Sequence, residues 1–407
     1  MTRGAVTVRR RAVTVTALAS VAVLVSSCGG SDDSTSTSSS SAASSAASTA
    51  TGSSSGVQGV VDAADAFVAT LDENQQSQVL LDFTDDTAAA WSNLPCGSSC
   101  RVGVPFSDLT DDQITSAKAL LQASLGTGGG TGYDQAMQIL LADDYLGSVG
   151  GTGGGAAGGG GTAPTGAMPS GGGTAPTDAG GGAGGGAGGG GYSSDNYYVA
   201  LLGTPGTTGT WQLHFGGHHL AVNITYVDGA VAGATPYFVG VEPTSWTADD
   251  GTTYTPLDVM KDGMLALTSS LSADQLAEAK LSESYTDVLL GPDQDGQFPE
   301  TKAGLQVSEL SEDQQQLVLA AMKPWVSIAD DATADDLMAT YESELDDTHI
   351  SYSGNTDLTA QGDYVRIDGP SVWIEFVCQN GVVISDQIHY HTVYRDHTRD
   401  YGGELSF

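Results

Sequence analysis

The segments VNITYVDGAVAGATPYFV (residues 222–239) and IEFVCQNGVVISDQIHYH (374–391) decide the fold, because the second aligns with the first without a gap. Asp228-Gly229 in the first segment aligns with Asn380-Gly381 in the second, 152 residues further on. Both dipeptides favour the two positive φ angles that a type I′ turn requires. Each segment therefore predicts a tight β-hairpin, and with the strand expected before it each copy has about three strands.

The helical parts of the chain repeat as well, at a different spacing. GVPFSDLTDDQ (103–113) matches GLQVSELSEDQ (304–314), and LDENQ (71–75) matches LSADQ (271–275). In all four places an N-cap residue is followed three positions later by glutamine, which is the pattern of a capping box at a helix start. The four N-cap residues are Asp72, Thr110, Ser272 and Ser311.

The two spacings, 200 or 201 for the helix starts and 152 for the hairpins, differ by about 49 residues, so the first copy contains an insertion. The Gly-rich stretch 149–192 accounts for most of it, and its near lack of apolar side chains predicts a disordered segment. The rest predicts an α+β fold, a single domain over residues 57–407 built from an internally duplicated helices-then-antiparallel-strands unit. We expect six or so strands in an antiparallel sheet or barrel, with the helices packed on it.

Residues 1–28 have the features of an export signal: a basic start, an apolar run from Ala12 to Val25 and a small residue before Cys28. This combination resembles the signal peptide of bacterial lipoproteins. The resemblance implies cleavage before Cys28, lipidation of that cysteine with palmitate among other groups, and an extracytoplasmic location with the protein anchored to the lipid bilayer of the cell membrane. The alternative is an ordinary secretory peptide with an incidental cysteine. Residues 29–56, rich in Ser, Ala and Thr, predict a disordered tether.

The chain is strongly acidic, with 49 Asp and Glu residues against 13 Lys and Arg residues. Four of the basic residues lie in the leader, so nine remain after cleavage and the formal net charge becomes −40. Such a charge argues against any binding to nucleic acid, because phosphates are repelled.

Two further cysteines, Cys96 and Cys100, frame the short loop CGSSC. In an oxidising compartment this spacing predicts a local disulfide. Cys378 follows the strand pattern VWIEFV and is expected to be a buried, inert thiol.

The histidines are the candidate site residues. His389 and His391 stand at i and i+2, which places both on one face of a strand. Imidazole nitrogens that converge from well-anchored strands are typical ligands of zinc or copper. The candidate metal ligands are His218, His219, Glu375, His389 and His391, and the supporting residues are Asn223, Arg395 and Asp396. The alternative is that these side chains are structural, with each histidine hydrogen-bonded inside the sheet.

The expected register divides these residues between the two faces of the sheet. A strict two-residue turn at Asn380-Gly381 places His389 and His391 on the face of Ile374, and Glu375 on the opposite face, unless a β-bulge intervenes. The same count assigns the first-copy candidates, His218 to the first face and His219 and Asn223 to the second. Arg395 and Asp396 are expected to form a salt bridge that pins the C-terminal tail.

Several blocks of this sequence form one characteristic set: the Leu-x-x-x-Gln helix starts, WSNLP (91–95), FGGHHLAVN (215–223), GPSVWIEF (369–376), HYHTVYRD (389–396) and DYGG (400–403). Together these blocks resemble the bacterial and fungal family known as domain of unknown function 3500. The resemblance spans nearly all of residues 57–407 and implies that the candidate site residues lie in the family's motif blocks. It implies no particular chemistry. The family pattern Arg-Asp-Pro-x-Asn-Asp is altered here, because His397 and Arg399 replace the Pro and the Asn.

Two functions are compatible with the sequence. The first is a membrane-anchored, extracytoplasmic lipoprotein that binds a divalent transition metal through the histidines, with metal-dependent hydrolysis as the reaction class. The alternative is a non-enzymatic cell-surface binding module or scaffold that recognises a small molecule, glycan or peptide. The sequence leaves the ligand and the oligomeric state open.

Overall fold

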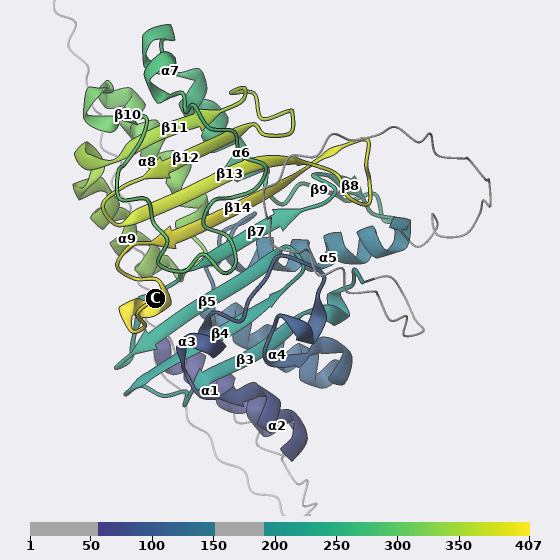
Figure 1. Ribbon diagram of the computed structural model, residues 1–407. Helices are drawn as coiled ribbons and strands as arrows, with labels where there is room; N and C mark the ends of the chain where they lie inside the picture. The colour runs from purple at the N-terminus through teal and green to yellow at the C-terminus, as the bar shows by residue number, and fades with distance from the viewer. Residues whose placement is uncertain (1–55, 151–190) are drawn as a thin grey trace, which may run out of the picture. The chain divides into compact units, whose positions relative to one another are not determined.

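The computed structural model describes residues 56–150 and 191–407 (Figure 1). The predicted leader with Cys28, the tether and most of the Gly-rich insertion lie outside these ranges. Within the described ranges, no helix combines the length and the apolar composition that a membrane span needs.

A 12-stranded sheet forms the centre of the described part of the chain. Its first-half strands are β1 (Leu80–Leu81), β2 (Val104–Pro105), β3 (Tyr198–Gly203), β4 (Thr210–Gly217), β5 (Leu220–Val227), β6 (Ala230–Gly233) and β7 (Tyr237–Val241). Its second-half strands are β10 (Leu305–Gln306), β11 (His349–Ser353), β12 (Tyr364–Asp368), β13 (Val372–Asn380) and β14 (Ile388–Asp396). The pair β8 (Trp246–Thr247) and β9 (Thr253–Tyr254) forms a separate small sheet.

The strand order shows the duplication directly. The main path runs β1-β3-β4-β5-β7-β14-β13-β12-β11-β10, so each half has its outermost strands at an edge and its last strand at the centre. All pairings are antiparallel except that of β1 with β3. The predicted α+β class is therefore confirmed, but the sheet is larger than the expected six or so strands. Its order has two ends, so it is an open sheet and not a barrel.

The larger helices pack on one face of this sheet (Figure 1). The first half supplies α1 (Val57–Ala69), α2 (Glu73–Val79), α4 (Asp111–Ser124) and α5 (Gly132–Gly150), and the second half supplies α6 (Asp258–Ser269), α7 (Ala273–Ala279), α8 (Glu312–Val326) and α9 (Asp331–Ser343). Strand residues such as Val222, Val239 and Ile374 meet the helices in one continuous apolar core. The other face carries a smaller apolar cluster, which includes Trp91 and Val288 from loops that cross it. We call these the helix face and the loop face.

All four predicted helix starts are confirmed, each with a complete capping box. The glutamines also join the two helices of each half. Gln113 accepts a hydrogen bond from the N–H of Thr110 at 2.8 Å and donates to Gln75 at 2.8 Å and to the carbonyl of Thr70 at 2.9 Å. Gln314 repeats this arrangement in the second half, where it donates to Gln275 and to the carbonyl of Ser270.

The hairpin prediction is confirmed in the first copy only. Asp228 and Gly229 have φ angles of 48° and 83°, and the strands on either side of them pair directly. In the second copy Asn380 pairs with Ile388, so the turn is a loop of residues 381–387 and the two-residue turn is wrong. Glu242 explains the longer loop, because one of its oxygens accepts the N–H groups of three consecutive loop residues at 2.7–2.8 Å. These residues are Val382, Val383 and Ile384.

The longer loop moves both histidines of β14 to the other face of the sheet. His391 pairs with Val377 and His389 pairs with Gln379, so both lie on the face of Glu375 and not on that of Ile374. The observed register differs from the expected one by seven residues, and any shift by an odd number of residues exchanges the two faces of a strand, which is the physical reason for this correction.

The same loop also changes which residues of the two copies correspond. The gap-free alignment made Val239 of the first copy equivalent to His391 of the second copy. Leu220 pairs with Val239 and its counterpart Val372 pairs with Asp396, so Val239 corresponds to Asp396. By this count Tyr237 corresponds to Tyr394, and these two tyrosines are also cross-strand partners in β7 and β14. A pseudo-twofold axis therefore passes between them.

The glutamine link between helix starts can be tested by its removal. Gln113→Ala deletes the bond that caps Thr110 and leaves the carbonyl of Thr70 without that donor, so we expect a loss of about 2 kcal/mol in the free energy of unfolding. Chemical denaturation measures this change. Gln122→Ala is the matched control, because Gln122 is an exposed residue of the same helix and should change stability by under about 0.5 kcal/mol. Equal effects of the two substitutions would contradict the role of Gln113.

Candidate metal centre

His389 and His391 approach each other on the loop face of β14. Their Nε2 atoms lie 3.3 Å apart, and both side chains are buried. Two nitrogens bound to a tetrahedral zinc ion at about 2.05 Å stand about 3.3 Å apart, which is the same separation. The two imidazoles are therefore already spaced as a pair of metal ligands.

His218 and His219 form the turn between β4 and β5, where Gly217 pairs with Leu220. His219 has a φ angle of 61°, a left-handed conformation that a histidine adopts at little cost compared with a β-branched residue. The carbonyl of His219 accepts the N–H of Gly240 at 2.8 Å, which ties the turn to β7. Since β7 pairs with β14, this turn reaches the histidines of the second half.

Three imidazoles meet at this junction of the two halves. The ring of His219 lies 5.0 Å from that of His391 and 5.5 Å from that of His389 between centroids. One ring nitrogen from each of the three lies within 4.8 Å of the other two. Asp143, His218 and His219 form a second group of the same compactness, so His219 belongs to both groups. We refer to Asp143, His218, His219, His389 and His391 as the histidine cluster.

Two carboxylates orient the imidazoles of the histidine cluster. Asp143 on α5 lies 2.7 Å from Nδ1 of His218, and Asp287 lies 2.9 Å from Nδ1 of His391. The contact with Asp143 places a proton on Nδ1 of His218 and leaves Nε2 of that ring free to act as a ligand. Nδ1 of His391 faces both Asp287 and the side-chain amide nitrogen of Gln379, which lies 2.8 Å away. Nε2 of His391 is the atom that faces His389. Asp287 keeps 47% of its side chain exposed and lies at the solvent side of the cluster.

Burial keeps the central imidazoles neutral. Burial, together with the neighbouring His391, lowers the pKa of His389 to about 3. Burial also holds the pKa of His219 well below its usual value, with the adjacent histidines acting in the same direction. The pKa of Asp143 is raised by burial, against the hydrogen bond from His218. A neutral imidazole is the form that binds a metal ion, so these two histidines are ready to act as ligands at pH 7.

Glu375, the remaining candidate ligand, lies on the same face but is fully occupied elsewhere. It is buried and accepts the N–H groups of Leu289 and Leu290 at 2.5 and 2.9 Å. It also accepts from Trp373 at 2.7 Å and from Tyr364 at 2.8 Å. Four donors use its lone pairs, so in this structure its carboxylate holds the loop that follows Asp287.

The three supporting residues also have structural partners. Asn223 donates to the carbonyl of Pro236 and accepts from Gln212. Arg395 and Asp396 lie on opposite faces of β14, and the expected salt bridge between them is wrong. Arg395 is fully buried and pairs with Asp295 and Asp400, whereas Asp396 pairs with Arg399 and caps the turn after β14.

Sequence reasoning missed four residues of this site: Asn93, Asp143, Gly240 and Asp287. Asp143 and Asp287 lie on a helix and in a loop with no repeated motif around them, so they carry no sequence signal. Gly240 leaves room for the rings, because a Cβ atom there would stand 2.9 Å from a ring carbon of His391 and 3.1 Å from one of His219. Asn93 falls in the WSNLP block, which was the one available signal.

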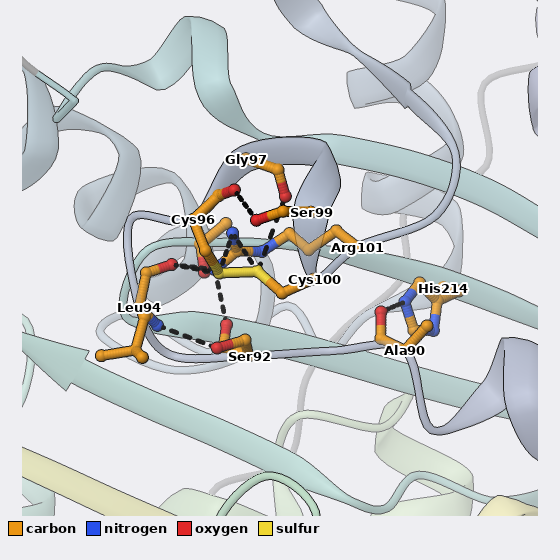
Figure 2. Close-up of a disulfide and its surroundings, with 10 residues drawn as sticks. Ala90, Ser92, Leu94, Cys96, Gly97, Ser99, Cys100, Arg101 and His214 are labelled. Atoms are coloured by element: carbon orange, nitrogen blue, oxygen red, sulfur yellow. Dashed lines mark hydrogen bonds between the residues drawn. A yellow bond between two sulfur atoms is a disulfide. The ribbon is translucent and has the colours of Figure 1, made fainter. Parts of the chain in front are cut away.

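Cys96 and Cys100 form a disulfide in the structure, close to the WSNLP block (Figure 2). Cys378 is a buried free thiol on the helix face, and burial raises its pKa to about 12.

The comparisons with known proteins add one result. The model of a family described as "Protein of unknown function (DUF3500)" matches residues 53–403, a range that contains the entire histidine cluster. No curated protein and no solved structure matches the chain. Since the family match covers most of the sequence, the resemblance seen in the motif blocks is confirmed, and the chain belongs to the DUF3500 family.

Proposed function

We propose that this protein binds one divalent transition-metal ion, zinc or copper, through His219, His389 and His391. The observation that supports the proposal most directly is the 3.3 Å separation of the Nε2 atoms of His389 and His391. This distance is long for an N–H···N hydrogen bond but matches two ligands of one tetrahedral ion. The ring nitrogen of His219 is within 4.8 Å of both and would complete a three-histidine set after a small side-chain shift.

The outer partners favour the same function. Asp287 faces Nδ1 of His391, which is the carboxylate–histidine arrangement that orients a metal-binding imidazole. His218, which Asp143 orients, stacks on His219 with ring centroids 3.7 Å apart. His218 is therefore the nearest further ligand of the cluster. Glu375, with its four donors, is not part of the proposed ligand set.

Three histidines leave a fourth tetrahedral position for water or substrate, as in hydrolytic zinc sites. A zinc ion held there would lower the pKa of a bound water to near neutrality. We propose metal-dependent hydrolysis as the reaction class. Activated carboxylic and phosphate esters, tested with metal-loaded and with chelated protein, would show it, and equal rates in both samples would refute it.

The proposed cellular setting is the one that the first 56 residues indicate: a lipoprotein anchored outside the cytoplasm through Cys28. Intact mass measurement of the membrane fraction tests this, because lipidation adds the mass of acyl chains at Cys28. A Cys28→Ala variant should then lack that mass. An unlipidated mature chain that starts elsewhere would contradict the anchor.

Metal content is the first test of the function. Tag-free protein reconstituted with zinc and then desalted should hold about one equivalent, and His389→Ala and His391→Ala should each hold less than about a tenth of that amount. His349→Gln is the matched control, since His349 lies on β11 outside the histidine cluster and should leave the content unchanged. Thermal melting confirms that each variant is folded. Wild-type protein that takes up no zinc, copper, nickel or iron would end the proposal.

Asp287 provides a test that leaves every proposed ligand in place. Asp287→Asn keeps the size of the side chain but removes the charge that orients His391, so metal affinity should fall by about 10- to 100-fold. Competition with a chromophoric chelator measures the affinity. Asp293→Asn, a change of the same kind in the same loop region, should leave it unchanged. A loss of equal size in both variants would point to bulk charge and not to orientation.

Gly240 tests whether the approach of His219 to His391 matters. In Gly240→Ala the new methyl group would stand 2.8 Å from the backbone oxygen of Tyr390, 2.9 Å from a ring carbon of His391 and 3.1 Å from one of His219. The β14 backbone and the two imidazoles must therefore shift, and zinc affinity should fall by at least about tenfold. Gly129→Ala is the control, because a Cβ atom there meets nothing within 4 Å. Unchanged affinity in a folded Gly240→Ala protein would show that His219 is not a ligand.

A further inference from the structure

Arg101 contacts the two segments that adjoin the histidine cluster, the WSNLP segment and the end of β4. Its Nη2 atom donates to three backbone carbonyls, those of Ser92 and Leu94 at 2.6 Å and that of Gly217 at 2.7 Å. The side chain is 7% exposed. One buried cationic group therefore joins the WSNLP segment to the last residue of β4.

Both joined segments lead directly to the proposed metal ligands. Gly217 is followed by the His218-His219 turn, and Asn93 lies between the two residues of WSNLP that Arg101 holds. The carbonyl of Asn93 accepts the N–H of His219 at 3.3 Å, and its side-chain nitrogen lies 3.5 Å from Nδ1 of His391. Asn93 therefore touches a ligand from each half of the molecule, and Arg101 fixes its place.

The disulfide holds Arg101 in turn (Figure 2). Nη1 of Arg101 lies 3.5 Å from both sulfur atoms of Cys96 and Cys100, while Nη2 makes the carbonyl contacts. The cross-link closes a loop of three residues, and Arg101 is the next residue after it. The backbone that carries Arg101 is thus fixed by a covalent bond.

We propose that Arg101 is the positioning residue of the metal centre, and that the Cys96–Cys100 disulfide acts on the centre through Arg101. This inference rests on the proposed metal-binding function. The physical reason is that loss of Arg101 removes the one donor group shared by the carbonyls of Ser92, Leu94 and Gly217, two of which are buried contacts, so the WSNLP segment and the end of β4 lose their common tie. Asn93 then no longer holds His219 and His391 at their present spacing.

Cobalt(II) binding to the full-length protein tests the proposal, because its visible absorption reports both affinity and coordination geometry. Arg101→Met keeps the length of the side chain but has no donor, and we expect at least about tenfold weaker binding with an altered spectrum. Arg101→Lys retains three donors on one nitrogen and should restore part of the affinity. Arg399→Met, which removes an arginine that contacts Asp396 and Thr398, should bind cobalt like wild type. Wild-type affinity in a folded Arg101→Met protein overturns the inference.

A double-substitution cycle tests the role of the disulfide. Cys96→Ser with Cys100→Ser should weaken cobalt binding in the wild-type background and add little in the Arg101→Met background, because both changes act on one unit. Additive losses would mean that the disulfide acts independently of Arg101, and would overturn that part of the proposal.

Hydrogen exchange separates failure of this inference from failure of the proposed function. In metal-free protein, the amide of His219 is protected by the carbonyl of Asn93, so Arg101→Met should accelerate its exchange while amides of the distant β11–β12 pair keep their rates. This outcome supports the positioning role even if wild-type protein binds no cobalt. Unchanged exchange at His219 refutes the role whether or not the metal binds.

Discussion

The antiparallel pairing of β7 with β14 is the interaction on which the candidate site depends. Five residue pairs join the halves there, from Tyr237 with Tyr394 to Val241 with Tyr390. His219 is hydrogen-bonded to one of these strands and His391 is a residue of the other, so the pairing converts a sequence separation of 172 residues into ring contact. Gly240, the β7 partner of His391 in this pairing, leaves the space that the two rings occupy.

The two faces of the sheet have different physical roles. Helices cover one face with apolar side chains, and the large buried area there is the main source of stability. Loops cover the other face, which carries buried polar side chains whose hydrogen bonds those loops supply. Glu375 and Arg395 show this clearly, because each binds backbone groups of the loop after Asp287. Buried polar groups are stable only with such partners. Among the cluster histidines, His218 and His391 have a carboxylate partner in Asp143 and Asp287, whereas Nδ1 of His389 has no hydrogen-bond partner in the described part of the chain.

The sequence was informative where the physics is local and silent where it is not. Capping boxes and the Asp228-Gly229 turn depend on neighbouring residues, and they formed as expected. The turn at Asn380-Gly381 did not, because Glu242, distant in sequence, binds three N–H groups of the loop that replaces it. That single contact changed the face of both β14 histidines. The repeats correctly indicated that histidines from both halves of the chain lie close together. However, no pattern in the chain could show that Glu375 would be used by Leu289 and Leu290, or that Asp143 and Asp287 would take its place beside the imidazoles.

The pseudo-twofold axis relates each position of the histidine cluster to an equivalent position in the other half. Rotation about it maps His218 and His219 onto Pro370 and Ser371. Val377, the partner of His391, maps onto Thr225, whose own partner is Gly233, and in the same way His389 maps onto Ala230. The rotated location thus has no imidazole at any of the four positions. A symmetric pair of identical units would have to carry two copies of every histidine at the junction, whereas in a single fused chain the two halves can carry different residues at corresponding positions. The first half contributes a turn and the second half contributes a strand, while the corresponding positions of the other half carry the small residues Pro370, Ser371, Gly233 and Ala230.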